Sequence, residues 1–125
     1  MKINALLTFV GIISLSVISC KAQEENTDVT ILSVEEAKTI LAEEPGAVFL
    51  DVRTPEEFNE GHIEGAVLIN FFDEDFKERV EALDKDKPVY IYCRSGNRSQ
   101  QAGMILTQMG FQEVYDIEAG YIGWE

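Results

Sequence analysis

The 125-residue chain has a single histidine, His62, and only two cysteines, Cys20 and Cys93. These residues are too few and too far apart in the sequence to form a metal site, and no glycine-rich nucleotide loop is present, so we expect neither a metal nor a cofactor. Basic residues are also scarce. Ten lysines and arginines stand against 23 acidic residues, for a formal net charge of −13. The phosphate backbone of nucleic acids repels such a chain, which excludes nucleic acids as partners.

The first twenty residues differ in composition from the rest of the chain. Lys2 precedes an apolar run over residues 5–18, which is short for a membrane span and typical of a secretory signal. Its ending, VISC, resembles the lipobox of bacterial lipoproteins, in which signal peptidase cuts before a cysteine that is then acylated. We therefore expect a signal peptide at 1–19 and a lipid on Cys20, which anchors an exported protein to the periplasmic face or outer surface of the bacterial cell envelope. An uncleaved anchor and an ordinary signal cut elsewhere are the alternatives.

Cleavage before Cys20 has consequences for the mature chain. It removes Lys2 but no acidic residue, which takes the formal charge from −13 to −14. Cys93 then remains as the one thiol of the folded part, where it cannot form an internal disulfide and is a candidate reactive group. The acylated cysteine and the polar, acidic segment after it, residues 20–30, are predicted to form a tether. Residues 31–125 suffice for one domain.

The hydrophobic pattern of the predicted domain alternates between strands and helices. Short apolar runs predict strands at 47–53, 66–70, 87–93 and 113–118. Capping residues and helical periodicity predict helices at 33–46, 54–61, 73–83 and 98–109, with Gly110 as the last stop signal and a short helix or turn at 119–125. Strands that alternate with helices predict an α/β fold with a parallel sheet.

The segment YIYCRSGNRSQQAG, residues 90–103, places Cys93 where a predicted strand ends and a helix is about to begin. Ligands of open parallel sheets bind beyond the carboxyl ends of the strands, and a loop of amides that leads into a helix attracts anions. Gly96 lets this loop turn back toward the cysteine. Such surroundings predict a lowered pKa for the thiol and hence a thiolate nucleophile. The residues expected to contact a bound anion are Arg94, Ser95, Gly96, Asn97, Arg98 and Ser99, with Arg53 from the end of the neighbouring strand.

Three segments of the chain together resemble rhodanese-like sulfurtransferases: LDVRTPEEFNEGHIEGAVLIN (50–70), PVYIYCRSGNRSQQAGMILTQMGF (88–111) and VYDIEAGYIGW (114–124). The resemblance implies a five-stranded parallel sheet flanked by helices on both faces. It also implies that Cys93 takes a sulfur atom from an anionic donor such as thiosulfate and passes it from a persulfide to cyanide, a thiol or a protein acceptor. A non-catalytic or partner-specific module that binds the persulfide is an alternative.

The spacing in this loop separates sulfur transfer from two other reactions. The same architecture carries phosphatases and arsenate reductases in which five residues lie between the cysteine and the arginine. Here four residues separate Cys93 from Arg98. The shorter loop makes a tighter cradle that suits a single sulfur atom, whereas the longer one suits a tetrahedral oxyanion. We therefore favour sulfur transfer over phosphatase or arsenate reductase activity.

Other residues of the resembling segments have expected roles outside the chemistry. Asp51 and Arg53 are expected to brace the neighbouring loop by an ion pair, and His62 to be structural rather than catalytic. Ala119 stands where the family often has the first glycine of a Gly-Gly pair, which predicts an altered last turn. The chain stops one residue after Trp124, so we expect a short, frayed terminal helix whose packing does not affect the chemistry.

Overall fold

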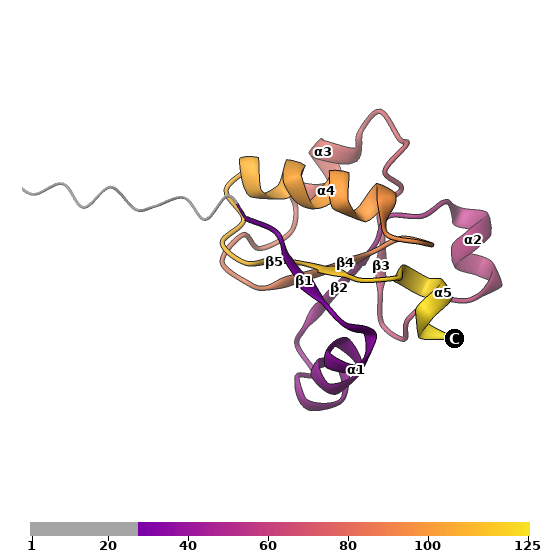
Figure 1. Ribbon diagram of the computed structural model, residues 1–125. Helices are drawn as coiled ribbons and strands as arrows, with labels where there is room; N and C mark the ends of the chain where they lie inside the picture. The colour runs from indigo at the N-terminus through magenta and orange to yellow at the C-terminus, as the bar shows by residue number, and fades with distance from the viewer. Residues whose placement is uncertain (1–27) are drawn as a thin grey trace, which may run out of the picture.

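The computed structural model describes residues 28–125, which form a five-stranded parallel sheet in the order β1-β5-β4-β2-β3 (Figure 1). The strands are β1 (Thr30–Leu32), β2 (Val48–Asp51), β3 (Val67–Leu68), β4 (Val89–Tyr92) and β5 (Val114–Ile117). The helices are α1 (Val34–Glu43), α2 (Pro55–Glu60), α3 (Phe76–Val80), α4 (Asn97–Gln108) and α5 (Gly120–Trp124). The expected signal peptide and the expected lipid site at Cys20 lie outside the described residues. Within the described range, no helix is long and apolar enough to cross a membrane.

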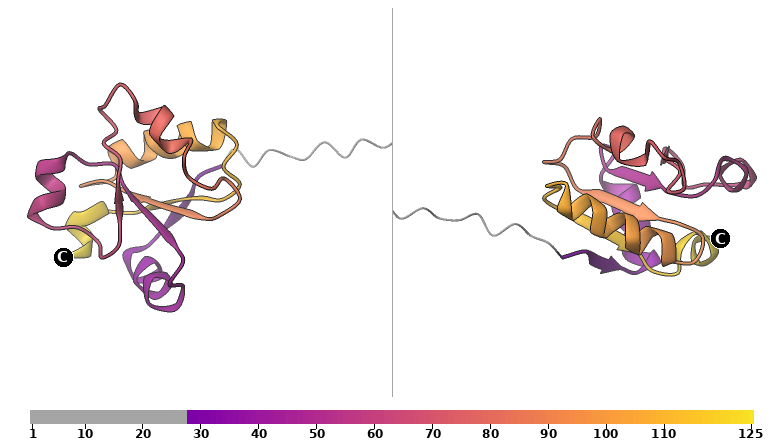
Figure 2. Two further views of the ribbon diagram at one scale, coloured as in Figure 1. Left: turned by 180° about the vertical axis from the view of Figure 1, so that it is seen from behind. Right: turned by 90° about the horizontal axis from the view of Figure 1, so that it is seen from above.

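Helices cover both faces of the sheet, which confirms the predicted α/β architecture (Figures 1 and 2). Helices α3 and α4 pack on one face over an apolar cluster that includes Leu50, Ile91 and Leu106. The opposite face packs against α1 and α5, and its cluster includes Phe49 and Tyr92. Every residue of the central strand β4 is buried, as expected for a parallel strand that is covered on both sides.

Two predicted elements are shorter in the structure than in the sequence pattern. The helix predicted at 73–83 is reduced to α3, because Asp75 makes no side-chain capping bond and the chain after Val80 continues in tighter turns. Those turns still bring Leu83 against the core. The strand predicted at 66–70 pairs only over β3. Strand β1 had no periodic signal of its own, since three residues at a sheet edge are too few to reveal a pattern.

The ends of the helices follow the predicted capping signals. The Ser33 side chain accepts a hydrogen bond from the Glu36 amide at the start of α1, and Thr54 forms a full capping box with Glu57 at the start of α2. Helix α4 ends as expected at Gly110, whose φ of +96° allows the amide of the next residue to bond back to the helix. Because all five strands run parallel, their carboxyl ends lie at one edge of the sheet, and Cys93 follows β4 at this edge.

Candidate active site

Cys93 follows β4 directly, and its sulfur lies against the loop that leads into α4. The Gly96 amide donates a hydrogen bond to Sγ at 3.0 Å, and the Ser99 hydroxyl oxygen lies 3.4 Å from the same atom. The turn that brings this amide back requires a φ of +106° at Gly96, which favours glycine. The predicted amide cradle around the sulfur is therefore present.

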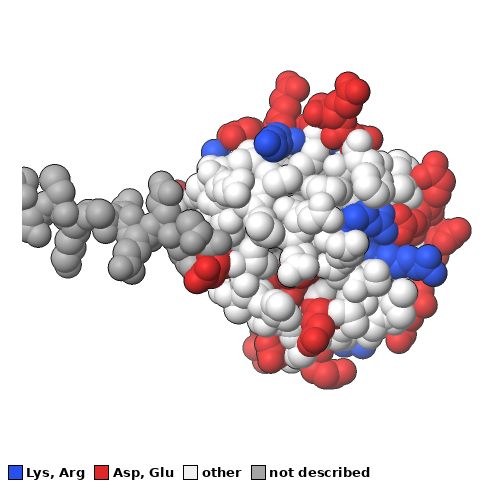
Figure 3. All heavy atoms as spheres, turned by 45° about the horizontal axis from the view of Figure 1, so that its top comes forward, with Lys and Arg blue, Asp and Glu red and all other residues white. Residues whose placement is uncertain are grey.

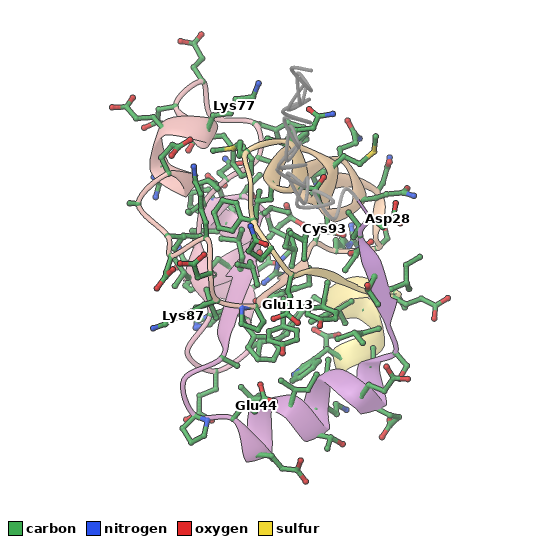
Figure 4. The ribbon with its side chains drawn as sticks, turned by 90° about the vertical axis from the view of Figure 1, so that its left-hand side faces the viewer. Asp28, Glu44, Lys77, Lys87, Cys93 and Glu113 are labelled. Carbon is green, nitrogen blue, oxygen red and sulfur yellow. The ribbon has the colours of Figure 1, made fainter. Side chains whose placement is uncertain are left out.

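The side chain of Cys93 is buried, although its neighbours in the loop are polar or basic. It is 1% exposed and belongs to the apolar cluster under α4. Figure 4 shows Cys93 well inside the outline of the molecule, whereas Glu44 and Lys87 lie near its edge. The sulfur nevertheless accepts a hydrogen bond from the Gly96 amide and lies within hydrogen-bond distance of the Ser99 hydroxyl, so burial here does not amount to an apolar environment.

The surroundings of Cys93 act on its pKa in opposite directions. Burial raises the pKa of the thiol, because a low-dielectric interior disfavours the thiolate. Hydrogen bonds from Ser99, from its amide and from the amides of Gly96 and Ser95 outweigh this effect, and the pKa is lowered overall. The loop thus favours the thiolate, which is the nucleophilic form of cysteine.

Arg98 does not extend freely from the loop, as its predicted role as an anion ligand implied. Its guanidinium makes two hydrogen bonds to the Glu57 carboxylate, at 2.7 and 2.9 Å, and lies 5.6 Å from the ring of Phe72. The Arg98 hydrogen bonds lower the pKa of Glu57 to about 2. This ion pair ties the cysteine loop to α2.

Glu57 is a residue of the site that sequence reasoning missed. The same carboxylate accepts hydrogen bonds from the Thr54 amide and hydroxyl within the α2 capping box. Glu57 fits the capping box at the start of α2, and no local signal points to its second partner 41 residues away.

Arg53 and Asp51 form the ion pair that the sequence predicted. The guanidinium of Arg53 donates to both Asp51 carboxylate oxygens and, at 2.7 Å, to the carbonyl oxygen of Gly61. It also lies 4.4 Å from the ring of Tyr121. Burial lowers the pKa of Arg53, but Asp51 outweighs this effect and raises it, so the buried arginine stays charged. His62 is exposed, stacks on the Phe58 ring and contacts the Phe58 carbonyl, away from Cys93.

Two cavities flank the cysteine loop, and five of the seven predicted anion-binding residues line one or the other. One, of about 270 Å³, is lined by Arg53, Glu57, Glu60, Arg94, Tyr121, Ile122 and Glu125. The other, of about 320 Å³, is lined by Ile31, Ser95, Gly96, Asn97, Gln100, Asp116, Glu118 and Ala119. Arg98 and Ser99 line neither cavity, and Ser99 is completely buried beside the sulfur.

Charges of both signs meet at the first cavity. Arg94 is exposed and makes no ion pair within the described part of the chain, which leaves its guanidinium available to an anion. Carboxylates line the same cavity, and on the face in Figure 3 the few basic side chains lie beside acidic ones. Across residues 28–125, no three histidine, cysteine or acidic side chains gather closely enough to hold a metal ion.

The terminal helix α5 holds the cysteine loop by its backbone, which sequence reasoning did not foresee. The Tyr121 amide donates to the carbonyl oxygen of Cys93 at 2.8 Å, and the Ile122 amide donates to that of Arg94 at 3.1 Å. Gly120 approaches so closely that a Cβ there would lie 2.5 Å from the first of these oxygens. The C-terminal helix therefore contacts the cysteine loop directly, which argues against the expectation that its packing does not affect the chemistry.

The profile of the family described as "Rhodanese-like domain" matches residues 33–125. The chain belongs to this family. A rhodanese-like domain protein from Staphylococcus aureus, with a known crystal structure, superposes with a TM-score of 0.70 at 28% identity, over 78% of this chain and 92% of that one. This likeness agrees with the sheet order and helical layers described above.

Curated relatives of this rhodanese-like domain are named as sulfurtransferases. The thiosulfate sulfurtransferase GlpE of Pseudomonas entomophila is 39% identical over 94 residues, which cover 74% of this chain and 82% of the relative. Thiosulfate sulfurtransferase 18 of Arabidopsis thaliana is 33% identical over 118 residues, covering 85% and 82%. Family membership and these relatives support sulfur transfer at the level of the family.

Proposed function

We propose that this rhodanese-like domain transfers a sulfane sulfur from a donor such as thiosulfate to cyanide or a thiol, through a persulfide on Cys93. The observation that carries the proposal is the buried sulfur that accepts the Gly96 amide at 3.0 Å and whose pKa the loop lowers. A thiolate held in this way is a nucleophile, and the amides around it can hold a second, anionic sulfur.

The reaction consists of two displacements at sulfur. The Cys93 thiolate attacks the outer sulfur of thiosulfate, a sulfur–sulfur bond forms, and sulfite leaves with the electron pair of the bond that breaks. The acceptor then attacks the outer sulfur of the persulfide and restores the Cys93 thiolate. In this scheme the free guanidinium of Arg94 attracts the anionic donor, while the ion pairs of Arg53 and Arg98 keep the loop in shape.

A thiosulfate:cyanide assay tests this proposal, with thiocyanate as the measured product. The full chain carries Cys20→Ser, so that Cys93 is its only thiol. We expect turnover by this protein, none by the additional Cys93→Ser variant, and a mass increase of one sulfur atom on Cys93 after exposure to thiosulfate. Turnover that survives Cys93→Ser would refute the role of this residue.

One feature of the first cavity favours a second candidate function. Glu60 and Glu125 line it and make no ion pair within residues 28–125, and their charges oppose the approach of a dianion such as thiosulfate. The domain would then accept sulfur only from a partner protein and hold it as a persulfide. A Cys93 persulfide that forms with a protein donor but not with thiosulfate supports this alternative.

We also infer that the mature protein begins at an acylated Cys20, after a signal peptide at 1–19, and is anchored on the outside of a bacterial membrane. The VISC ending supports this inference. Cys20→Ala should block cleavage before residue 20 and the addition of lipid. Unchanged processing and membrane association of that variant would contradict the inference.

A further inference from the structure

The cavity of about 320 Å³ beside the cysteine loop has no role in the proposed reaction. Residues from β1, from β5 and from the first turn of α4 line it, together with the loops that follow β4 and β5. Strand β1 is the edge strand of the sheet, and its Ile31 is 61% exposed where it lines the cavity. A ligand can therefore reach this cavity from the edge of the sheet.

Asp116 is a buried acidic residue in the wall of this cavity. It is in register with Ile31 of β1 and with Ile91 of β4, which packs in the apolar cluster under α4. The residue is only 5% exposed, and its Oδ1 atom has no hydrogen-bond partner within the described residues. A buried carboxyl group that lacks donors is costly. Its place in a cavity wall therefore points to a ligand that supplies donors.

The rest of the wall adds acceptors and negative charge. Glu118 is exposed and makes no ion pair within residues 28–125. No lysine or arginine of the described chain lines this cavity, in contrast to the first one. Hydroxyl and amide oxygens are contributed by Ser95, Asn97 and Gln100. The wall therefore suits a cation that carries hydrogen-bond donors.

The chemistry of the wall narrows the class of cation. A metal ion does not fit, because no three histidine, cysteine or acidic side chains of the described part gather closely enough to hold one. A guanidinium is bound best by both oxygens of one carboxylate, and Oδ1 of Asp116 is buried. A primary ammonium is compact, and its three donors can reach acceptors on several sides.

The size of the cavity limits the rest of the ligand. A volume of about 320 Å³ corresponds to roughly ten molecules of liquid water, so a short carbon chain fills it. The exposed side chain of Ile31 and the methyl group of Ala119 offer apolar contacts to such a chain.

We propose that this cavity binds a small primary amine in its ammonium form, with the charge held by Asp116 and Glu118 and the carbon chain against Ile31. Burial raises the pKa of Asp116, and a bound ammonium would offset this effect by favouring the carboxylate. Asp116 should contribute more to binding than Glu118, because solvent screens an exposed carboxylate.

Gly96 connects the proposed site to the cysteine. It lines the cavity, and its amide donates the hydrogen bond of 3.0 Å to Sγ of Cys93. A bound amine would therefore border the loop that holds the sulfur. The binding itself does not depend on the proposed sulfur transfer.

An NMR titration of the ¹⁵N-labelled full chain with propylammonium chloride tests the proposal. The protein again carries Cys20→Ser. We expect saturable shifts of the amide signals of Gly96, Asn97 and Ala119, which line the cavity, and none with sodium chloride at the same ionic strength. Tetramethylammonium has the same charge but no N–H donor. It should bind about tenfold more weakly or worse, because hydrogen bonds to a charged group are lost.

Three substitutions complete the test. Asp116→Asn keeps the shape of the side chain and should weaken propylammonium binding about tenfold or more. Glu118→Gln should weaken it by about two- to fivefold. Glu60→Gln, which neutralises an exposed carboxylate of the first cavity, should leave the affinity unchanged.

The outcomes that overturn the proposal are equally defined. These are the absence of saturable shifts, equal affinity for tetramethylammonium, and an affinity that Asp116→Asn does not change. If Asp116→Asn fails to fold, the comparison of the two cations and the Glu118→Gln variant decide the matter. Loss of thiosulfate:cyanide turnover with propylammonium binding intact would refute only the proposed function.

Discussion

The close contact between Gly120 and the cysteine loop predicts that Gly120→Ala lowers the activity of the protein. An added Cβ would lie 2.5 Å from the Cys93 carbonyl oxygen and 2.6 Å from that of Arg94. Folded proteins essentially never show such contacts below 3.0 Å, so the loop or α5 must move by about 0.5 Å or more. Either movement would disturb the hydrogen bonds that the Tyr121 and Ile122 amides donate to these two carbonyl oxygens.

The expected effect on activity follows from the size of this shift. A displacement of about 1 Å in a reacting group can cost about 100-fold in rate, so a shift of half that size or more predicts a loss of roughly 10- to 100-fold in kcat. The left-handed backbone itself is tolerable for alanine, since the preceding residue Ala119 has a φ of +61°. The clash with the loop therefore dominates the effect of the substitution on activity.

Gly110→Ala is the matched control for this experiment. Gly110 also has a positive φ, of +96°, but a Cβ there would meet nothing within 4 Å. Both variants should lose about 1 kcal/mol or more of stability from backbone strain, measured by urea denaturation. Only Gly120→Ala should lose thiosulfate:cyanide activity at temperatures where both are folded. Equal activities for the two variants would refute the idea that α5 sets the position of the loop.

Two further predictions concern stability. Glu57→Gln should cost roughly 1–2 kcal/mol at neutral pH, after allowance for the partial exposure of the pair. Arg98 lowers the pKa of Glu57 from 4.5 to about 2. The difference in unfolding free energy between the two proteins, measured by urea titration, should therefore be complete above pH 4.5 and shrink as the pH falls toward 2. A difference that does not depend on pH would contradict this prediction. Ala119→Gly should relieve the left-handed strain, stabilise the fold by about 0.5–1 kcal/mol and raise Tm by a few degrees. The control Ala42→Gly, in helix α1, should lower Tm, and a lower Tm for Ala119→Gly would argue against the strain.

Local patterns were sufficient to predict most of the fold. The helix caps at Ser33 and Thr54 and the stop at Gly110 depend on neighbours within a few residues, and the structure has all three. The pattern failed at β1, because three residues hold too little periodicity to reveal a strand. It extended α3 too far, because the turns after Val80 still bring Leu83 against the core and so resemble a continued helix in the sequence.

The sequence by itself determined the cradle around Cys93, because the sulfur, the Gly96 amide and the turn that joins them lie within a few consecutive residues. Tertiary structure alone decided what holds that cradle. Glu57 and the α5 amides come from two other segments of the chain, and only the tertiary packing brings them against the loop. Contacts of this kind depend on the three-dimensional path of the chain, which cannot be inferred from the spacing of residues that are near in the sequence.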